Sequence, residues 1–327
     1  MSSPKVIDVH AHILFDELLG MMGDLGPGLR HGENGSVLWM GGYELPVGYE
    51  SSVELDPGER IAQLDAAGID IQVMAPSPLW YFNHADVTVA EPFIRRHNEL
   101  LAEWCAGNPD RFRFFAELPT QDIGLAIKEL ERSVRELGAL APYISTDLGI
   151  DLDDPGLDDF YAAVVELDVP LMFHPGVAGI DSPMRDARLR RFLGDVLLGY
   201  PYEETIAIVQ LIFGRVLERH PELDVCLTHG GGAAPFLYGR LHQYFTGTLR
   251  WNPEDDLAPD DFPAYFERLW FDSHVHHPEA LRLLTTLANR DRLVLGTNFG
   301  GWDAEPAVDA GDPTLDLPGN AARLLRL

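Results

Sequence analysis

The sequence contains little cysteine and little basic charge. Only two of its 327 residues are cysteines, Cys105 and Cys226, which excludes a disulfide-rich secreted scaffold and makes a reducing cytoplasm the expected location. Lysine and arginine number 24 against 52 aspartates and glutamates, for a net charge of −28. Such a chain repels nucleic acid and anionic membranes, so we expect neither as a partner.

Long apolar runs are also missing. No apolar stretch of the sequence reaches the roughly 20 residues that a membrane span needs. The start, Met-Ser-Ser-Pro-Lys, leads straight into a strand pattern, so we expect no signal peptide. Hydrophobic residues make up 46% of the chain and charged residues 23%, as in ordinary soluble proteins, and a chain of this length buries a large core without disulfides.

Strand-like and helix-like patterns alternate along the chain. The eight strand candidates are Val6–His10, Ile69–Ala75, Phe112–Leu118, Ala139–Ser145, Val169–His174, Leu223–His229, Leu269–His274 and Leu293–Asn298. Helical patterns separate most of them, which indicates a parallel sheet. Eight such units predict one α/β domain over residues 1–327, a distorted (β/α)8 TIM-like barrel.

Two connections exceed ordinary loop length. They are insertions at about residues 15–56 and 176–200; the first is rich in glycine and holds Trp39, and the second holds several arginines, including Arg188 and Arg190. Each follows a strand, so both should lie on the catalytic face, at the carboxyl ends of the strands. Their composition favours a lid over a substrate, and an irregular surface loop is the alternative.

Histidines end several of the predicted strands. His10 and His12 lie at the end of the first strand, and because strand side chains alternate, both point the same way, into the barrel. His174 ends the fifth strand and His229 the sixth. Since barrel active sites are built from the carboxyl ends of several strands, these four imidazoles should converge on one point and can hold a metal ion such as zinc, iron, manganese or nickel.

On these histidines and on four motifs, the chain resembles the amidohydrolase-related family that includes aminocarboxymuconate semialdehyde decarboxylase and the aromatic-acid decarboxylases. The motifs are Glu203-Glu204-Thr205, Thr228-His229-Gly230-Gly231-Gly232, Gly239-Arg240 and Val294-Leu295-Gly296-Thr297-Asn298. The resemblance implies a distorted barrel, usually paired as a homodimer, that uses a divalent metal to act on a small molecule.

The resemblance also implies roles for individual residues. His10, His12 and His174 match the family's metal ligands. His229 matches its water-activating histidine, and we keep it as a candidate ligand as well. Arg240 matches an arginine that reaches the substrate of a neighbouring subunit, and His276 matches a histidine after the seventh strand, so both are candidates for substrate binding.

Position 298 departs from the family pattern. The family's eighth strand ends Gly-Thr-Asp-Tyr-Pro, whereas this chain reads Gly296-Thr297-Asn298-Phe299-Gly300. Asn298 can offer its carbonyl oxygen to a metal but carries no charge. We therefore expect Asn298 to face the metal cavity and another anion to compensate. Asp272, Asp303 and Asp8 are the candidates for that anion, and Asp272, Asp303 and Asn298 are catalytic candidates beside His229.

Two further departures bear on the metal and the substrate. Ser273-His274-Val275-His276-His277 is dense in nitrogen donors, and the family usually has an apolar residue at position 274. His274 indicates an altered or second metal site, with supporting histidines as the alternative. No lysine on the middle strands can form a carbamate bridge, so a standard binuclear hydrolase centre is not expected. Trp39 aligns with a carboxylate-binding arginine of the decarboxylase, which favours a flatter, more apolar substrate than a small dicarboxylate.

Three functions remain open. The first is a metal-dependent lyase or hydrolase, using zinc or manganese to decarboxylate or hydrolyse an aromatic or unsaturated carboxylic acid. The second is a non-haem iron oxygenase or hydroxylase of secondary metabolism with one or two iron ions. The third is a binding protein on the same scaffold, which the four strand-end histidines disfavour. The metal content of the purified protein distinguishes the first function from the second.

Overall fold

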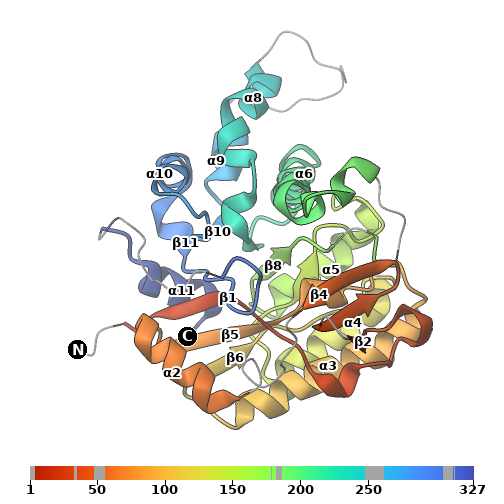
Figure 1. The fold of residues 1–327 in the computed structure, drawn as a ribbon. Coiled ribbons are helices and arrows are strands. Elements are labelled where there is room, and N and C mark those ends of the chain that lie inside the picture. Colours follow the sequence, from red (N-terminus) through yellow and green to blue (C-terminus); the bar gives the residue numbers. More distant parts are fainter. Residues whose placement is uncertain are drawn as a thin grey trace.

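A closed barrel of parallel strands forms the centre of the molecule (Figure 1). The computed structural model describes residues 4–32, 35–47, 56–177, 179–181, 186–246, 261–304, 312 and 314–327. Within these ranges, the eight barrel strands are β1 (Ile7–Ile13), β5 (Ile71–Pro76), β6 (Phe112–Phe114), β7 (Tyr143–Ser145), β8 (Leu171–His174), β9 (Val225–Leu227), β10 (Trp270–Asp272) and β11 (Leu293–Val294). Each overlaps one of the eight strands predicted from the sequence.

The barrel closes through isolated bridges between two sheets. One sheet has the order β1-β5-β6 and the other β11-β10-β9-β8-β7. A parallel bridge between Ala116 and Pro142 joins β6 to β7, and bridges from Asp8 to Leu295 and from Ala11 to Phe299 join β1 to the chain after β11. These bridges complete the ring, and the predicted (β/α)8 barrel is confirmed.

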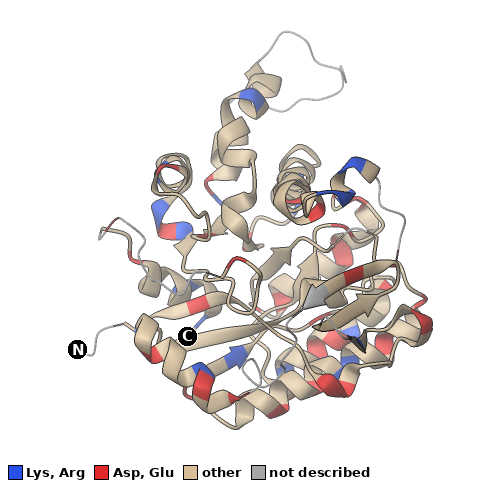
Figure 2. Cartoon of the chain, in the orientation of Figure 1, with Lys and Arg blue, Asp and Glu red and all other residues tan. Residues whose placement is uncertain are grey.

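Helices cover the outside of the barrel and run between its strands. They are α2 (Pro57–Ala67), α3 (Val87–Ala106), α4 (Ile123–Arg132), α5 (Asp158–Glu166), α6 (Tyr200–Phe213), α7 (Val216–Arg219), α8 (Ala234–Thr246), α9 (Asp261–Phe266), α10 (Pro278–Leu287) and α11 (Leu317–Leu325). Aspartates start several of them: the carboxylates of Asp56, Asp122 and Asp316 accept hydrogen bonds from free amide groups of the first turns of α2, α4 and α11. Acidic residues are distributed over many of these outer helices (Figure 2).

The first insertion is a small antiparallel sheet rather than an irregular loop. It contains β2 (Gly28–Gly32), β3 (Gly35–Met40) and β4 (Tyr43–Val47). The second insertion contains two short helical turns, η6 (Ala187–Arg190) and η7 (Asp195–Gly199). The two insertions touch, because the Gly42 amide donates to the Ile180 carbonyl at 3.1 Å. Gly41 has a φ of +49°, and a Cβ there would overlap the same carbonyl oxygen, so this approach requires glycine.

The pairing of β1 with β5 is irregular where the histidines of β1 lie. Ile7 and Val9 pack in the inner core cluster with Met172 and Val294. The register between β1 and β5 then shifts between Asp8 and Ala11. A bulge changes which residues face inward, and the shift lets His10 and the residues after it reach the barrel mouth although Val9 also faces the inner core.

Several predicted strands are shorter than their apolar patterns. β9, β10 and β11 end at Leu227, Asp272 and Val294, before the histidines and the asparagine predicted to end them. His229 and Asn298 have φ angles of +46° and +52°, which a strand cannot contain. The functional residues therefore lie on the turns that leave the barrel.

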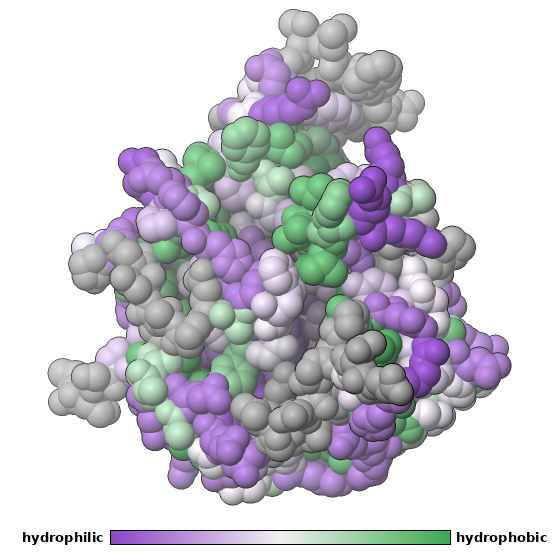
Figure 3. All heavy atoms as spheres, in the orientation of Figure 1, coloured by the Kyte–Doolittle hydropathy of each residue, from purple (hydrophilic) through white to green (hydrophobic). Residues whose placement is uncertain are grey.

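The helical segment Asp195–Phe213 is apolar enough, by length and composition alone, to span a membrane. This contradicts the expectation that no such run exists. Its buried residues include Ala207, Ile208 and Leu211, which pack into the core as in the wall helix of a barrel. On its outer side, Leu198 and Tyr202 are 65% and 60% exposed. Figure 3 shows hydrophobic surface over this region and over α8.

Candidate metal centre

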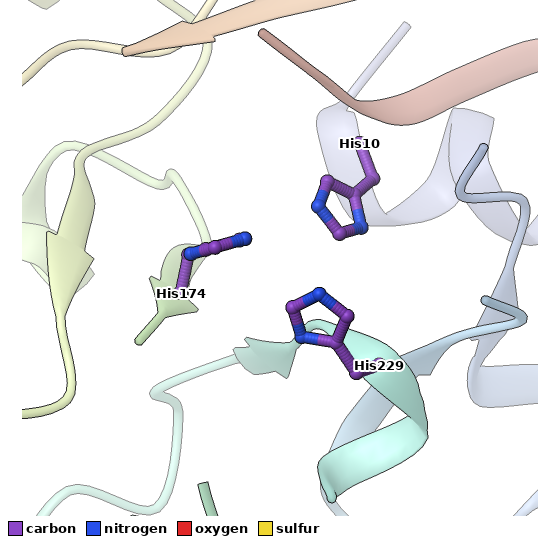
Figure 4. Close-up of side chains that lie close together, drawn as sticks. All are labelled: His10, His174 and His229. Atoms are coloured by element: carbon purple, nitrogen blue, oxygen red, sulfur yellow. The ribbon is translucent and has the colours of Figure 1, made fainter. Parts of the chain in front are cut away.

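Three imidazoles meet at the mouth of the barrel (Figure 4). The ligand nitrogens of His10, His174 and His229 all lie within 4.8 Å of one another. The His12 ring lies beside them, with its centroid 5.2 Å from that of His10 and 5.0 Å from that of His174. The structure therefore brings together the four strand-end histidines predicted from the sequence.

Two backbone carbonyls fix how the rings of His12 and His174 carry their protons. His12 Nδ1 lies 3.0 Å from the carbonyl oxygen of Pro76, and His174 Nδ1 lies 2.7 Å from that of Pro175. A carbonyl oxygen only accepts hydrogen bonds, so each Nδ1 carries the proton and each Nε2 of a neutral ring presents a lone pair. Burial lowers the pKa of His12 to about 3 and that of His174 well below its ordinary value, so both rings are neutral near pH 7.

A buried carboxylate orients His10 in the same manner. Asp272 Oδ2 lies 2.6 Å from His10 Nδ1, and neither side chain is more than 1% exposed. The Nε2 atoms of His10, His12 and His174 are buried and lack a hydrogen-bond partner among the described residues. Buried polar atoms are normally satisfied, so three unsatisfied Nε2 atoms at one place fit a divalent metal ion, for which neutral imidazole is a favoured ligand.

His229 has a different environment from the other three rings. Its Nδ1 lies 3.0 Å from Glu204 Oε1, and the same oxygen accepts a hydrogen bond from the Thr228 hydroxyl at 2.7 Å. Burial opposes a charge on His229, but the carboxylates of Glu204, Asp272 and Asp303 outweigh it and raise the pKa of His229 above its ordinary value. His229 is therefore suited to carry a positive charge, whereas the other three rings are neutral.

Asn298 lies in a second group of polar residues at the same rim. Its side chain is 4% exposed, its Nδ2 donates to Asp303 Oδ1 at 2.5 Å, and its buried Oδ1 has no hydrogen-bond partner among the described residues. Asp303 also contacts His276 and His274, with Oδ2 2.7 Å and 3.4 Å from their Nε2 atoms. Although burial raises the pKa of Asp303, these two histidines hold it well below its ordinary value. Asp303 is therefore the carboxylate that accompanies Asn298.

The two other candidate anions, Asp272 and Asp8, contact residues that support the site. Asp272 supports His10 and accepts hydrogen bonds from the amide groups of Gly230 and His274. Asp8 accepts hydrogen bonds from the side chains of Gln72 and Thr297, both at 2.7 Å. Asp8 thus ties β1 to its two neighbouring strands, a structural role that its position in the sequence did not reveal.

The predicted substrate-binding residues are scattered. Trp39 lies in β3, where its indole covers Gly28 so closely that a Cβ there would overlap it, and Arg30 lies over its ring at 5.8 Å. Among the described residues no ring contact joins Trp39 to the histidines. Arg240 is exposed on α8. His276 contacts Asp303 at the rim.

The sequence does not reveal Glu204 as the partner of His229, nor the carbonyls of Pro76 and Pro175 as partners of His12 and His174. Glu204 belongs to a motif that supports the family resemblance, but no local pattern links it to a residue 25 positions away. His229, His276 and Asn298 all have positive φ angles. Residues other than glycine rarely adopt this conformation and gather at functional sites when they do, which agrees with the placement of all three at this rim.

A barrel with a histidine metal site at the carboxyl ends of its strands defines the class of this protein. The chain belongs to the amidohydrolase family, whose pattern it matches over residues 7–327. It is 33% identical over 250 residues to a 2-amino-3-carboxymuconate-6-semialdehyde decarboxylase of Dictyostelium discoideum, an alignment that covers 75% of this chain and 66% of that protein. It is 30% identical over 257 residues to a 2-keto-4-carboxy-3-hexenedioate hydratase of a Sphingobium strain, covering 76% of this chain and 69% of that protein.

Solved structures of similar fold include the 5-carboxyvanillate decarboxylase of Novosphingobium aromaticivorans with bound manganese and a nitrobenzoic acid. It superimposes with a TM-score of 0.80 at 22% identity, over 99% of this chain and 98% of that one. This likeness confirms the fold, and the manganese is a property of that protein.

Proposed function

We propose that this chain is a metal-dependent decarboxylase of an aromatic or unsaturated carboxylic acid. The observation that carries the proposal is the convergence of the unpartnered Nε2 atoms of His10, His12 and His174 at the barrel mouth. Family membership and the decarboxylases among the relatives support the reaction class. The manganese of the related structure favours Mn²⁺, and the same donors suit Zn²⁺. No observation favours the iron oxygenase or a binding protein without activity.

The metal and the residues around it have different roles in the reaction. When bound, the metal supplies Lewis-acid polarisation of the substrate's oxygen atoms. Decarboxylation breaks the bond between the carboxylate and its carbon, carbon dioxide leaves, and the electron pair left on that carbon takes up a proton. Protonated His229 is the group placed to deliver this proton, and Glu204 holds the ring and stabilises its charge. Water then returns a proton to His229.

A cavity of about 590 Å³ next to the site favours one class of substrate. It is lined by Ser145, which pairs with His174 across β7 and β8, and by Gly176, two residues beyond His174. Its described lining carries five carboxylates, among them Asp147, Asp181 and Glu203, against the one guanidinium of Arg188, which is paired with Asp186. A second substrate carboxylate would be repelled there, so we propose a substrate with a single carboxylate, as Trp39 suggested.

The proposal includes the oligomeric state of the protein and its location in the cell. The protein acts as a homodimer in the cytoplasm, as the family resemblance and the two cysteines suggest. Phe236 on α8 is 82% exposed and offers apolar surface for the dimer contact. Phe245, on the same helix, is 2% exposed and packs against Phe213 and Phe262 instead.

The test is to incubate manganese-loaded protein with a panel of hydroxybenzoic and enoic acids labelled with ¹³C in the carboxyl group. Decarboxylation in D₂O releases labelled carbon dioxide and leaves one deuterium on the vacated carbon. His229→Gln should lose at least a hundredfold in turnover while keeping its metal, because general acid catalysis contributes roughly 10²–10⁴-fold. Addition of water without release of carbon dioxide would contradict decarboxylation and favour hydration, the reaction named for the Sphingobium relative.

A further inference from the structure

A second cluster of metal-ligand side chains lies beside the first. Donor atoms of His274, His276 and Asp303 all lie within 4.8 Å of one another. His276 Nε2 is 2.7 Å and His274 Nε2 is 3.4 Å from Asp303 Oδ2, and the two histidine rings are in contact with centroids 4.5 Å apart. None of these three residues is needed to hold the metal at His10, His12 and His174.

His274 is the member of the cluster that the protein alone does not satisfy. Its side chain is 0% exposed, its Nε2 approaches Asp303 Oδ2 only to 3.4 Å, and neither ring nitrogen makes a hydrogen bond to a described residue. Leaving a buried polar group without a partner costs free energy, and an apolar residue at position 274 would avoid this cost. The buried Oδ1 of Asn298, whose Nδ2 is bonded to Asp303, is unpartnered in the same way.

We propose that His274, His276 and Asp303 bind a second divalent metal ion beside the one held by His10, His12 and His174. Two imidazoles and a carboxylate are a common donor set for zinc and manganese. Ligand atoms about 2.1 Å from one ion lie roughly 3.0–3.4 Å apart for octahedral or tetrahedral geometry. The distance of 3.4 Å between His274 Nε2 and Asp303 Oδ2 meets this already, and the contact with His276 needs to open by a few tenths of an ångström.

The turn that carries Asp303 is fixed to the first site. The His12 amide donates to the Phe299 carbonyl at 2.6 Å, and the Gly301 amide donates to the Asn298 carbonyl at 2.8 Å. Gly300 has a φ of +83°, and a Cβ there would lie 2.7 Å from the His12 carbonyl oxygen. The chain can approach β1 this closely only with glycine at that position, so Asp303 is held in place before any metal binds.

His274 also lies next to the first site. The centroid of its ring is 5.6 Å from that of His10 and 5.7 Å from that of His229. Two ions bound in these clusters would be neighbours, in a centre that needs no lysine carbamate. The family has an aspartate at position 298, and the negative charge that Asn298 lacks is then supplied by Asp303. The second cluster therefore contains a carboxylate, whereas the first set of ligands has only imidazoles.

The experiment counts bound manganese on the full-length chain, stripped with chelator and dialysed against excess Mn²⁺. Wild type should retain two equivalents per chain by elemental analysis, and Asp303→Asn and His276→Ala should each retain one. His277→Ala is the matched control and should retain two, because His277 caps α10 by accepting a hydrogen bond from the Glu279 amide at 3.2 Å. Circular dichroism confirms that each variant is folded.

Two results would overturn the second site: one equivalent in wild type at saturating Mn²⁺, or two equivalents in both Asp303→Asn and His276→Ala. The count does not rest on the proposed reaction. Two equivalents in a protein that decarboxylates no acid of the panel would contradict the function and leave the second site standing. One equivalent in a protein that does decarboxylate an acid of the panel would contradict the second site and support the function.

Discussion

Asp272 holds His10 from behind, with its Oδ2 2.6 Å from His10 Nδ1 and both side chains buried. The other carboxylate oxygen accepts hydrogen bonds from the amide groups of Gly230 at 3.0 Å and His274 at 3.2 Å. One side chain of β10 therefore orients the proposed metal ligand His10 on β1 and the backbone that follows β9.

Replacing Asp272 should weaken metal binding without removing a ligand. We expect Asp272→Asn to lower the affinity for Mn²⁺ by roughly 10- to 100-fold, because the negative charge that fixes the proton on His10 Nδ1 is lost and the amide can also present a donor. Competition with a fluorescent chelator measures the change. Asp224→Asn is the control, since Asp224 pairs with Arg292 and Arg326 and not with the site. An unchanged affinity in Asp272→Asn would show that His10 needs no support or is not a ligand.

Glu204→Gln should move the pH profile of turnover. The negative charge of Glu204 favours protonated His229, so its removal lowers the pKa of His229. An acid acts only below its pKa, so the alkaline limb of kcat should shift to lower pH in the variant, while metal content stays the same. Thr205→Ser changes a neighbour that bonds the Pro201 carbonyl and should leave the profile in place. A shift of the alkaline limb to higher pH would contradict the acid role of His229.

Restoring the family residue with Asn298→Asp should make the protein depend more strongly on metal. The new carboxylate would contact Asp303 where the amide now donates a hydrogen bond at 2.5 Å, and two buried like charges repel. We expect a lower melting temperature without metal, a larger increase on adding Mn²⁺, and a change in kcat/KM of at least tenfold, about 1.4 kcal/mol. Asn289→Asp, which keeps the cap of a surface turn, is the control. If all three quantities match wild type, position 298 is a bystander.

Mixing two inactive variants tests the role of Arg240 in a dimer. His10→Ala should lose metal and activity while staying folded, and Arg240→Ala should lose activity while keeping its metal. If Arg240 completes the partner's site, mixed dimers contain one site with both groups intact, so up to half of the wild-type activity per mixed dimer should return. Arg282→Ala on exposed α10 is the control and should stay active alone. No recovery despite subunit exchange, followed by native mass spectrometry, would exclude a role across the interface.

The sequence by itself determined the barrel and the histidines at its mouth. Alternating strands and helices leave few arrangements, and parallel strands bring their carboxyl ends to one rim. Thus His10, His12, His174 and His229 were predicted together although more than 200 residues separate the first from the last. The substitution at Asn298 was equally visible, because it interrupts a recognisable motif.

Only the tertiary structure decided how these side chains are held. The carbonyls of Pro76 and Pro175 set the protons of His12 and His174, and Glu204 and Asp303 reach His229 and His274 from other parts of the chain. Such contacts form only when segments far apart in the sequence are placed relative to one another to within a few tenths of an ångström. Hydrophobic periodicity specifies which face a residue occupies, but hydrogen-bond geometry arises only when the whole barrel has closed.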